Sequence, residues 1–142
     1  MRLLLMLFTV VMLMGQGRAN TCALPTSIVG KTILIRANGV YSPLNTLADS
    51  IIEYVFKEKT YEVTILNSRK MNSGTYFYRR LNPMLARFSV ISGSGESLTL
   101  YSQTFVCETN NIGYSIFSQT KGLYKPDIKQ NFGIFIIQDQ DE

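Results

Sequence analysis

The side chains best suited to chemistry lie in the stretch SGTYFYRRLN, where three consecutive aromatic residues precede two arginines. In a β-strand, Tyr76 and Tyr78 share one face and Phe77 takes the other. Tyrosine combines apolar area with a hydroxyl group that binds polar atoms. The stretch therefore fits three roles: cross-strand aromatic packing with Arg79 and Arg80 at a strand end, a ligand cavity with these arginines at its mouth, or an exposed patch that binds a partner.

Enzymatic chemistry finds few suitable groups in this chain. It contains no histidine, which excludes a histidine general base, a Ser-His-Asp triad and a histidine metal site. Glu53 and Glu62 flank a short connection, but both alternate with apolar residues and are expected to point to solvent. Two cysteines without a histidine are a poor ligand set for a metal. We therefore expect a protein that is not an enzyme and has no catalytic residue, metal or cofactor.

The first nineteen residues have the features of a secretory signal peptide. Arg2 supplies a positive start, residues 3–15 are apolar, and the small residue Ala19 suits a cleavage site. The apolar run is too short to cross a bilayer comfortably. A buried hydrophobic helix and an uncleaved anchor are the alternatives. We expect a cleaved signal peptide over 1–19 and a single domain over 20–142, exported to the periplasm or the extracellular space.

The only two cysteines are Cys22 and Cys107. An even number of cysteines in an exported chain favours one disulfide. Such a bridge would tie the amino-terminal segment to a late strand. Two buried free thiols are the alternative, and Thr21 makes a poor residue before a lipid-modified cysteine.

The charge of the chain gives no sign of nucleic-acid binding. Without Arg2 and Arg18, twelve lysines and arginines stand against ten acidic residues, a net charge of +2. The basic residues are scattered, whereas a nucleic-acid groove needs a contiguous basic surface. We therefore expect no nucleic-acid partner.

Short runs of alternating apolar and polar residues, separated by turn residues, are typical of an all-β sandwich or barrel. Hairpin-length connections predict antiparallel neighbours, and closure into a barrel removes exposed edges. We expect an antiparallel up-and-down β-barrel of about eight strands, whose interior is either filled or holds one small ligand. A short helical turn is expected near 44–50. The expected strands are 31–39, 50–58, 60–67, 75–81, 85–92, 97–108, 114–120 and 132–138.

The closing strand is apolar on both faces between Phe132 and Ile137. A strand of this kind is expected to be covered on both sides. The amino-terminal segment, pinned through Cys22, is the element expected to cover it.

Several motifs resemble those of small exported bacterial lipocalin-like proteins. They are Gly30-Lys31-Thr32 at the first strand, SGTYFY (73–78) at a middle one, and the later GYSIFSQTKG and NFGIFII. The resemblance extends over most of residues 28–137 and implies an up-and-down barrel of the calycin type, often without an assigned function. True lipocalins carry Gly-x-Trp near the first strand, and avidin-like barrels bind biotin with tryptophans. This chain has no tryptophan, so biotin binding finds no support.

The expected function is non-catalytic binding of a small apolar or amphipathic ligand inside the barrel. The main alternative is a protein-binding module, such as an exported inhibitor or host-interaction factor, that uses loops or an edge strand; a structural envelope component is a third. A cavity of about 300 Å³ or more would favour a ligand. A filled interior with an outer apolar patch beyond a few hundred Å² would favour a protein partner. The expected lining residues are Tyr54, Phe56, Tyr76, Tyr78, Phe88 and Tyr114, with Arg79 and Arg80 at the mouth.

Overall fold

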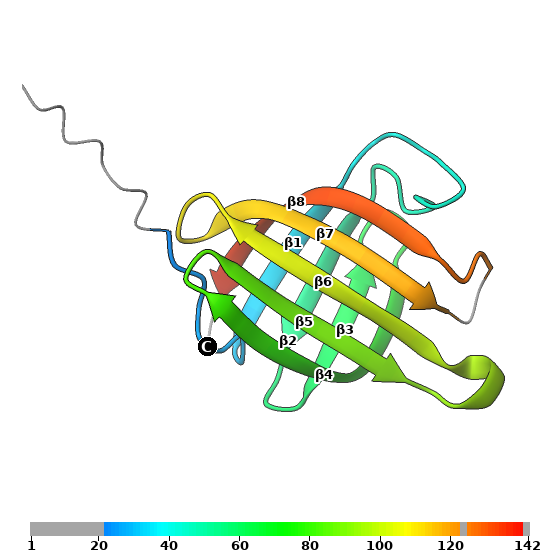
Figure 1. The fold of residues 1–142 in the computed structure, drawn as a ribbon, viewed down its shortest axis with the longest axis horizontal. Coiled ribbons are helices and arrows are strands. Elements are labelled where there is room, and N and C mark those ends of the chain that lie inside the picture. The colour runs from blue at the N-terminus through cyan, green and yellow to red at the C-terminus, as the bar shows by residue number, and fades with distance from the viewer. Residues whose placement is uncertain (1–21, 123–124, 141–142) are drawn as a thin grey trace, which may run out of the picture.

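A computed structural model describes residues 22–122 and 125–140, which form one closed antiparallel barrel (Figure 1). The expected signal peptide, 1–19, lies outside the described residues. Each strand pairs with the next, and β8 pairs with β1, which confirms the predicted fold class. Among the described residues, no helix has the length and apolarity needed to cross a membrane. The strands are β1 (Lys31–Ala37), β2 (Ile51–Phe56), β3 (Thr60–Ile65), β4 (Lys70–Asn82), β5 (Leu85–Ser92), β6 (Thr99–Cys107), β7 (Ile112–Lys121) and β8 (Lys129–Asp139).

Alternation along each strand sends every second side chain into the barrel. In β2, for example, Ile52, Tyr54 and Phe56 are buried. The predicted tight hairpin between β2 and β3 is present: Phe56 pairs with Tyr61, and the Lys57 N–H donates to the Thr60 carbonyl over 2.8 Å. Strand β4 begins earlier than expected, and its register with β5 shifts near its end, between Arg80 and Asn82.

The expected helical turn near 44–50 is wrong. The connection from β1 to β2 is a loop of tight turns, held from inside by Asn45. The Asn45 side-chain amide donates to the carbonyls of Asn38 (3.1 Å) and Val40 (2.8 Å). Such bonds from an asparagine side chain compete with helix formation. Asp49 has a φ of 59°, which a right-handed helix does not accept.

The amino-terminal segment, residues 22–30, closes one end of the barrel (blue, at the left of Figure 1). The predicted disulfide between Cys22 and Cys107 is confirmed, with a Cα–Cα distance of 5.9 Å. Leu24 and Ile28 are buried against the core, and the Leu24 N–H donates to the Pro83 carbonyl over 2.8 Å.

The expectation that this segment covers the last strand is therefore wrong. Residues 22–30 cross the end of the barrel and continue directly into β1. At that end the Gly30 N–H bonds to the Phe56 carbonyl. The inner side of β8 is buried at Phe135 and Ile137. Its outer side remains exposed at Phe132, Ile134 and Ile136.

Candidate functional site

Aromatic rings fill the middle of the barrel. Phe88 is fully buried, and its ring centroid lies 5.2 Å from that of Tyr54 and 5.3 Å from that of Phe56, both edge to face. Towards β8, Phe105 and Phe135 meet at 4.9 Å in the same way. These are contact distances for aromatic pairs. The rings pack against one another across the middle of the barrel.

Five of the six residues predicted to line a cavity do face the interior, where they belong to this packing. Tyrosine hydroxyls in the barrel bind protein atoms. Tyr76 donates to the Lys57 carbonyl over 2.9 Å, and Tyr78 donates to the Pro25 carbonyl over 2.7 Å. Deeper inside, the Tyr101 hydroxyl donates to that of Tyr61 over 2.8 Å. These bonds satisfy the polar ends of an apolar core. The five are Tyr54, Phe56, Tyr76, Tyr78 and Phe88.

The remaining predicted site residues do not share one cavity. Tyr114 points outward from β7 and stacks on Phe132, with ring centroids 5.4 Å apart. Arg80 lies at the end closed by residues 22–30, where it donates to the Leu24 carbonyl over 2.9 Å. Arg79 lies on the outer face of β4, directly opposite Arg87. The two adjacent arginines therefore point in different directions and do not form a common charged mouth.

Burial makes the barrel sensitive to alkali. It raises the pKa of Tyr78 to about 12, although the nearby charge of Arg80 opposes the change, and it also raises the pKa of Tyr61 and Tyr101. Tyrosines in the unfolded chain ionise near pH 10. Their contribution to stability is therefore fully present below about pH 10 and is lost as the pH rises through the folded-state values.

We predict a urea midpoint that is constant from pH 8 to pH 9 and falls steeply by about pH 11.5. Unfolding followed by circular dichroism at each pH measures it. In Tyr78→Phe the fall should be shallower, because one raised pKa is removed. A midpoint that holds through pH 11.5 in the wild type would show that these hydroxyls ionise as freely in the barrel as in the unfolded chain.

Two polar groups inside the barrel were not predicted from the sequence. Gln103 and Ser115 are 2% and 0% exposed, and within the described part of the chain neither Gln103 Nε2 nor Ser115 Oγ has a hydrogen-bond partner. Buried polar atoms without a partner are rare in native proteins. The sequence holds a signal for the burial of Gln103. This residue lies two positions from Tyr101 and two from Phe105, so it shares their inward side of β6.

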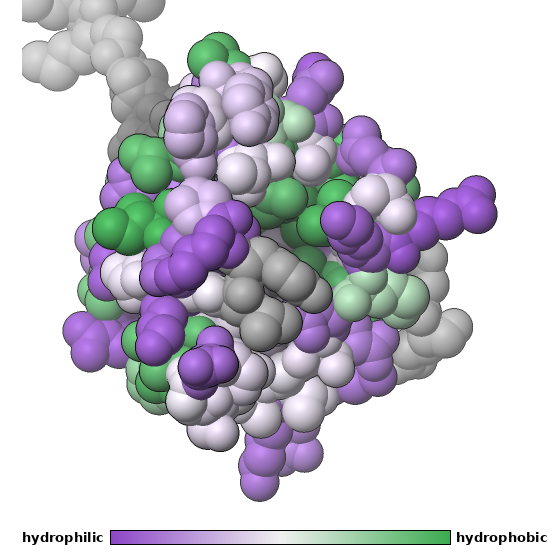
Figure 2. Space-filling view, turned by 90° about the vertical axis from the view of Figure 1, so that its right-hand side faces the viewer, coloured by the Kyte–Doolittle hydropathy of each residue, from purple (hydrophilic) through white to green (hydrophobic). Residues whose placement is uncertain are grey.

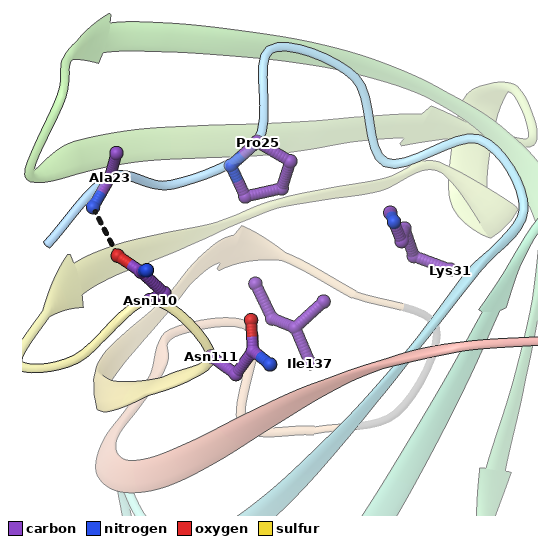
Figure 3. A pocket seen from close by; sticks show the side chains of 6 residues that line it. All are labelled: Ala23, Pro25, Lys31, Asn110, Asn111 and Ile137. Atoms are coloured by element: carbon purple, nitrogen blue, oxygen red, sulfur yellow. Dashed lines mark hydrogen bonds between the residues drawn. The ribbon is translucent and has the colours of Figure 1, made fainter.

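Two shallow hollows of the described chain lie near the ends of the barrel. One, of about 280 Å³, lies between residues 22–30 and the turn after β6, with Ile137 among its lining residues (Figure 3). Two of its polar groups already have partners in the protein: Asn110 Oδ1 accepts from the Ala23 N–H, and Lys31 pairs with Asp139. A second, of about 230 Å³, lies between β1 and β8 beside Gly133. Ligand pockets are usually larger, from about 300 Å³ upward.

The opposite end of the barrel faces the viewer in Figure 2. There hydrophilic residues are mixed with hydrophobic ones, and some hydrophilic side chains project outward. This mixture is ordinary for a protein surface, where scattered apolar residues need no functional explanation.

The outer side of β7 and β8 is different, and we call it the β7–β8 face. Six of its side chains are large, apolar and 39% to 52% exposed. They lie directly opposite one another in three cross-strand pairs. The pairs are Ile112 with Ile136, Tyr114 with Ile134, and Ile116 with Phe132.

This face is also free of charge. Apart from their end residues Lys121, Lys129 and Asp139, the described strands β6, β7 and β8 contain no charged side chain. On the next strand, β1, Arg36 is paired with Asp49 over 3.0 Å. Charged side chains gather on the outside of the other half of the barrel. They include Glu53 on β2, Glu62 on β3, Arg79 on β4 and Arg87 on β5.

Fold and site together define a class of molecule: an up-and-down β-barrel with a packed interior and one apolar outer face. No protein-family model, curated protein or solved structure matches the chain. The eight antiparallel strands are consistent with the lipocalin-like fold that the sequence motifs predict. Membership of that family stays a prediction.

Proposed function

We propose that this protein is an exported, non-catalytic binding protein that docks a protein partner on the β7–β8 face. The observation that carries the proposal is the combination of a packed interior with six paired, exposed, uncharged apolar side chains outside it. The disulfide supports export, because such bonds persist in oxidising compartments.

The size of the face supports a docking role. A large apolar side chain offers about 200 Å², so six at two-fifths to one half exposure present on the order of 500 Å². The largest apolar patch on a typical soluble monomer measures about 300–600 Å² and is often functional, and this face lies within that range.

The binding element is the face of a sheet. An edge strand is not available in the described chain, because β8 pairs with β1 over seven residues from Lys31 to Ala37 and closes the barrel. A partner therefore gains its affinity from apolar burial, and main-chain pairing at an edge plays no part.

Chemical cross-linking of the exported protein tests the proposal, with Ile134→Glu as the test variant and Ile91→Glu as its matched control. Ile134 lies in the middle of the face, whereas Ile91 is 71% exposed on the outside of β5, among the charged strands. We expect one discrete cross-linked species with the wild type and Ile91→Glu, and its loss with Ile134→Glu. A species that survives in Ile134→Glu would contradict docking on this face, as would its absence from all three proteins.

A specific observation favours a second candidate function, the binding of a small guest inside the barrel. Gln103 Nε2 and Ser115 Oγ point inward from neighbouring strands and have no hydrogen-bond partner among the described residues, so a guest with hydrogen-bond acceptors would offer them partners. This second function is the carrier role expected from the sequence. It requires the aromatic rings inside the barrel to move apart when the guest binds.

Native mass spectrometry of residues 20–142 tests the guest. If the barrel carries one, the native mass exceeds the denatured mass by a fixed amount, and Gln103→Leu, which keeps the side-chain volume, abolishes the difference. If the barrel is packed, both proteins have equal native and denatured masses. Gln103→Leu is then neutral or stabilising, because it removes an unpaired buried amide.

A further inference from the structure

We infer that the partner on the β7–β8 face is a second copy of this chain, packed face to face about a two-fold axis. The inference rests on the proposed use of this face for protein binding and names its occupant. The area, the chemistry and the arrangement of the face each point to the second copy.

The β7–β8 face can pack against the same face of a second copy. In a two-fold dimer the same patch serves both subunits, so residue i meets residue j and j meets i. Strands β7 and β8 run antiparallel and each contributes three large apolar side chains to the face. Turning the face over onto its own copy therefore sets apolar groups against apolar groups, with Tyr114 and Ile134 nearest the axis.

The absence of charge from the described part of the face favours the same partner. Interfaces between two different proteins usually carry complementary charges, so charged groups are expected on both surfaces. Homodimer interfaces are more apolar and are depleted in charge at their centre. The two charged side chains of β1, Lys31 and Arg36, are paired within the same chain with Asp139 and Asp49, so two copies meet without repulsion.

The area suits a reversible dimer. Two faces of on the order of 500 Å² each bury about 1,000 Å² of apolar surface, the lower limit for a specific interface. Leu34 and Val106 extend the face on either side; Leu34 lies opposite Ile136, and Val106 lies opposite Tyr114. Two such sheets would pack with their strands nearly aligned, about 10 Å apart.

Sedimentation equilibrium of the exported, disulfide-bonded protein tests the inference. We expect a monomer–dimer equilibrium for the wild type and for Ile91→Glu. Ile134→Glu should weaken the dimer by about 100-fold or more, because it places two carboxylates near the axis. Thermal unfolding of Ile134→Glu and Ile91→Glu controls for folding, and both should retain a cooperative transition.

A charge exchange distinguishes a second copy from any other partner. Ile134→Glu and Ile134→Lys should each be monomeric alone, and an equimolar mixture should form a dimer, because opposite charges then meet at the axis. A mixture that stays monomeric overturns the two-fold geometry.

The failure of the inference is distinguishable from that of the proposed function. The wild type could be monomeric at all concentrations and still form a cross-linked species that Ile134→Glu abolishes. If the mass added by cross-linking differs from that of one further chain, the second copy is overturned and the docking face remains in place. A monomeric wild type with no species sensitive to Ile134→Glu overturns both.

Discussion

Replacing Phe88 with alanine should lower the free energy of unfolding by about 3–5 kcal/mol. Phe88 is fully buried, and its ring touches those of Tyr54, Phe56, Tyr101 and Phe105. Its removal takes away a large apolar group and leaves a cavity that these rings cannot close. Urea unfolding followed by tyrosine fluorescence measures the loss.

Phe77→Ala is the matched control, since Phe77 is 68% exposed on the outside of the adjacent strand β4. It should change the free energy of unfolding by no more than about 0.5 kcal/mol. If Phe88→Ala does not fold, Phe88→Leu should still fold with a smaller loss, because leucine leaves a smaller void. A loss at Phe88 as small as that at Phe77 would mean that the barrel is hollow there, and the ligand-carrier function would regain support.

Removing the disulfide should have an effect of similar size. The double variant Cys22→Ala, Cys107→Ala should lose about 2–5 kcal/mol, because the bridge closes a long loop whose entropy then returns to the unfolded chain. The separation of 85 residues places the expected loss towards the upper part of this range. The burial of Leu24 and Ile28 against the end of the barrel depends on the same anchor.

Urea unfolding of the double variant, beside the oxidised wild type, measures this loss. Hydrogen exchange should locate it, with faster exchange at the Leu24 N–H, which bonds to the Pro83 carbonyl. A loss below about 1 kcal/mol would indicate that the hydrogen bonds and apolar contacts of residues 22–30 hold the segment without the covalent link.

The sequence predicted the strands well because most of them alternate apolar and polar residues and are bounded by turn residues. The sequence left the inward parity open, but the candidate lining residues that it offered on β2, β4 and β5 do point inward. In β7 this reasoning failed: Tyr114 points outward, and Gly113 and Ser115 point inward. The interior at that level is already filled by rings from the flanking strands. A Cβ on Gly113 would lie 2.9 Å from the Phe135 ring.

The long-range features were harder to predict. Whether residues 22–30 lie over β8 or across the end of the barrel depends on where Cys107 falls in the closed sheet, which no local pattern specifies. The prediction for β8 failed for the same reason. Its two apolar sides led us to expect that both are covered, but only the inner side is. The unpaired atoms of Gln103 and Ser115 depend on strand register, which the sequence does not determine.

Hydroxyl-radical footprinting of the exported protein tests the central claim, that the working surface is the β7–β8 face, most directly. The native reporters are Tyr114 and Phe132 on the face, with Phe77 on the opposite half of the barrel as the internal reference. In its native state, we expect Tyr114 and Phe132 to be protected while Phe77 reacts fully, and dilution or Ile134→Glu to restore their reactivity. Equal reactivity of all three residues under every condition would contradict the claim.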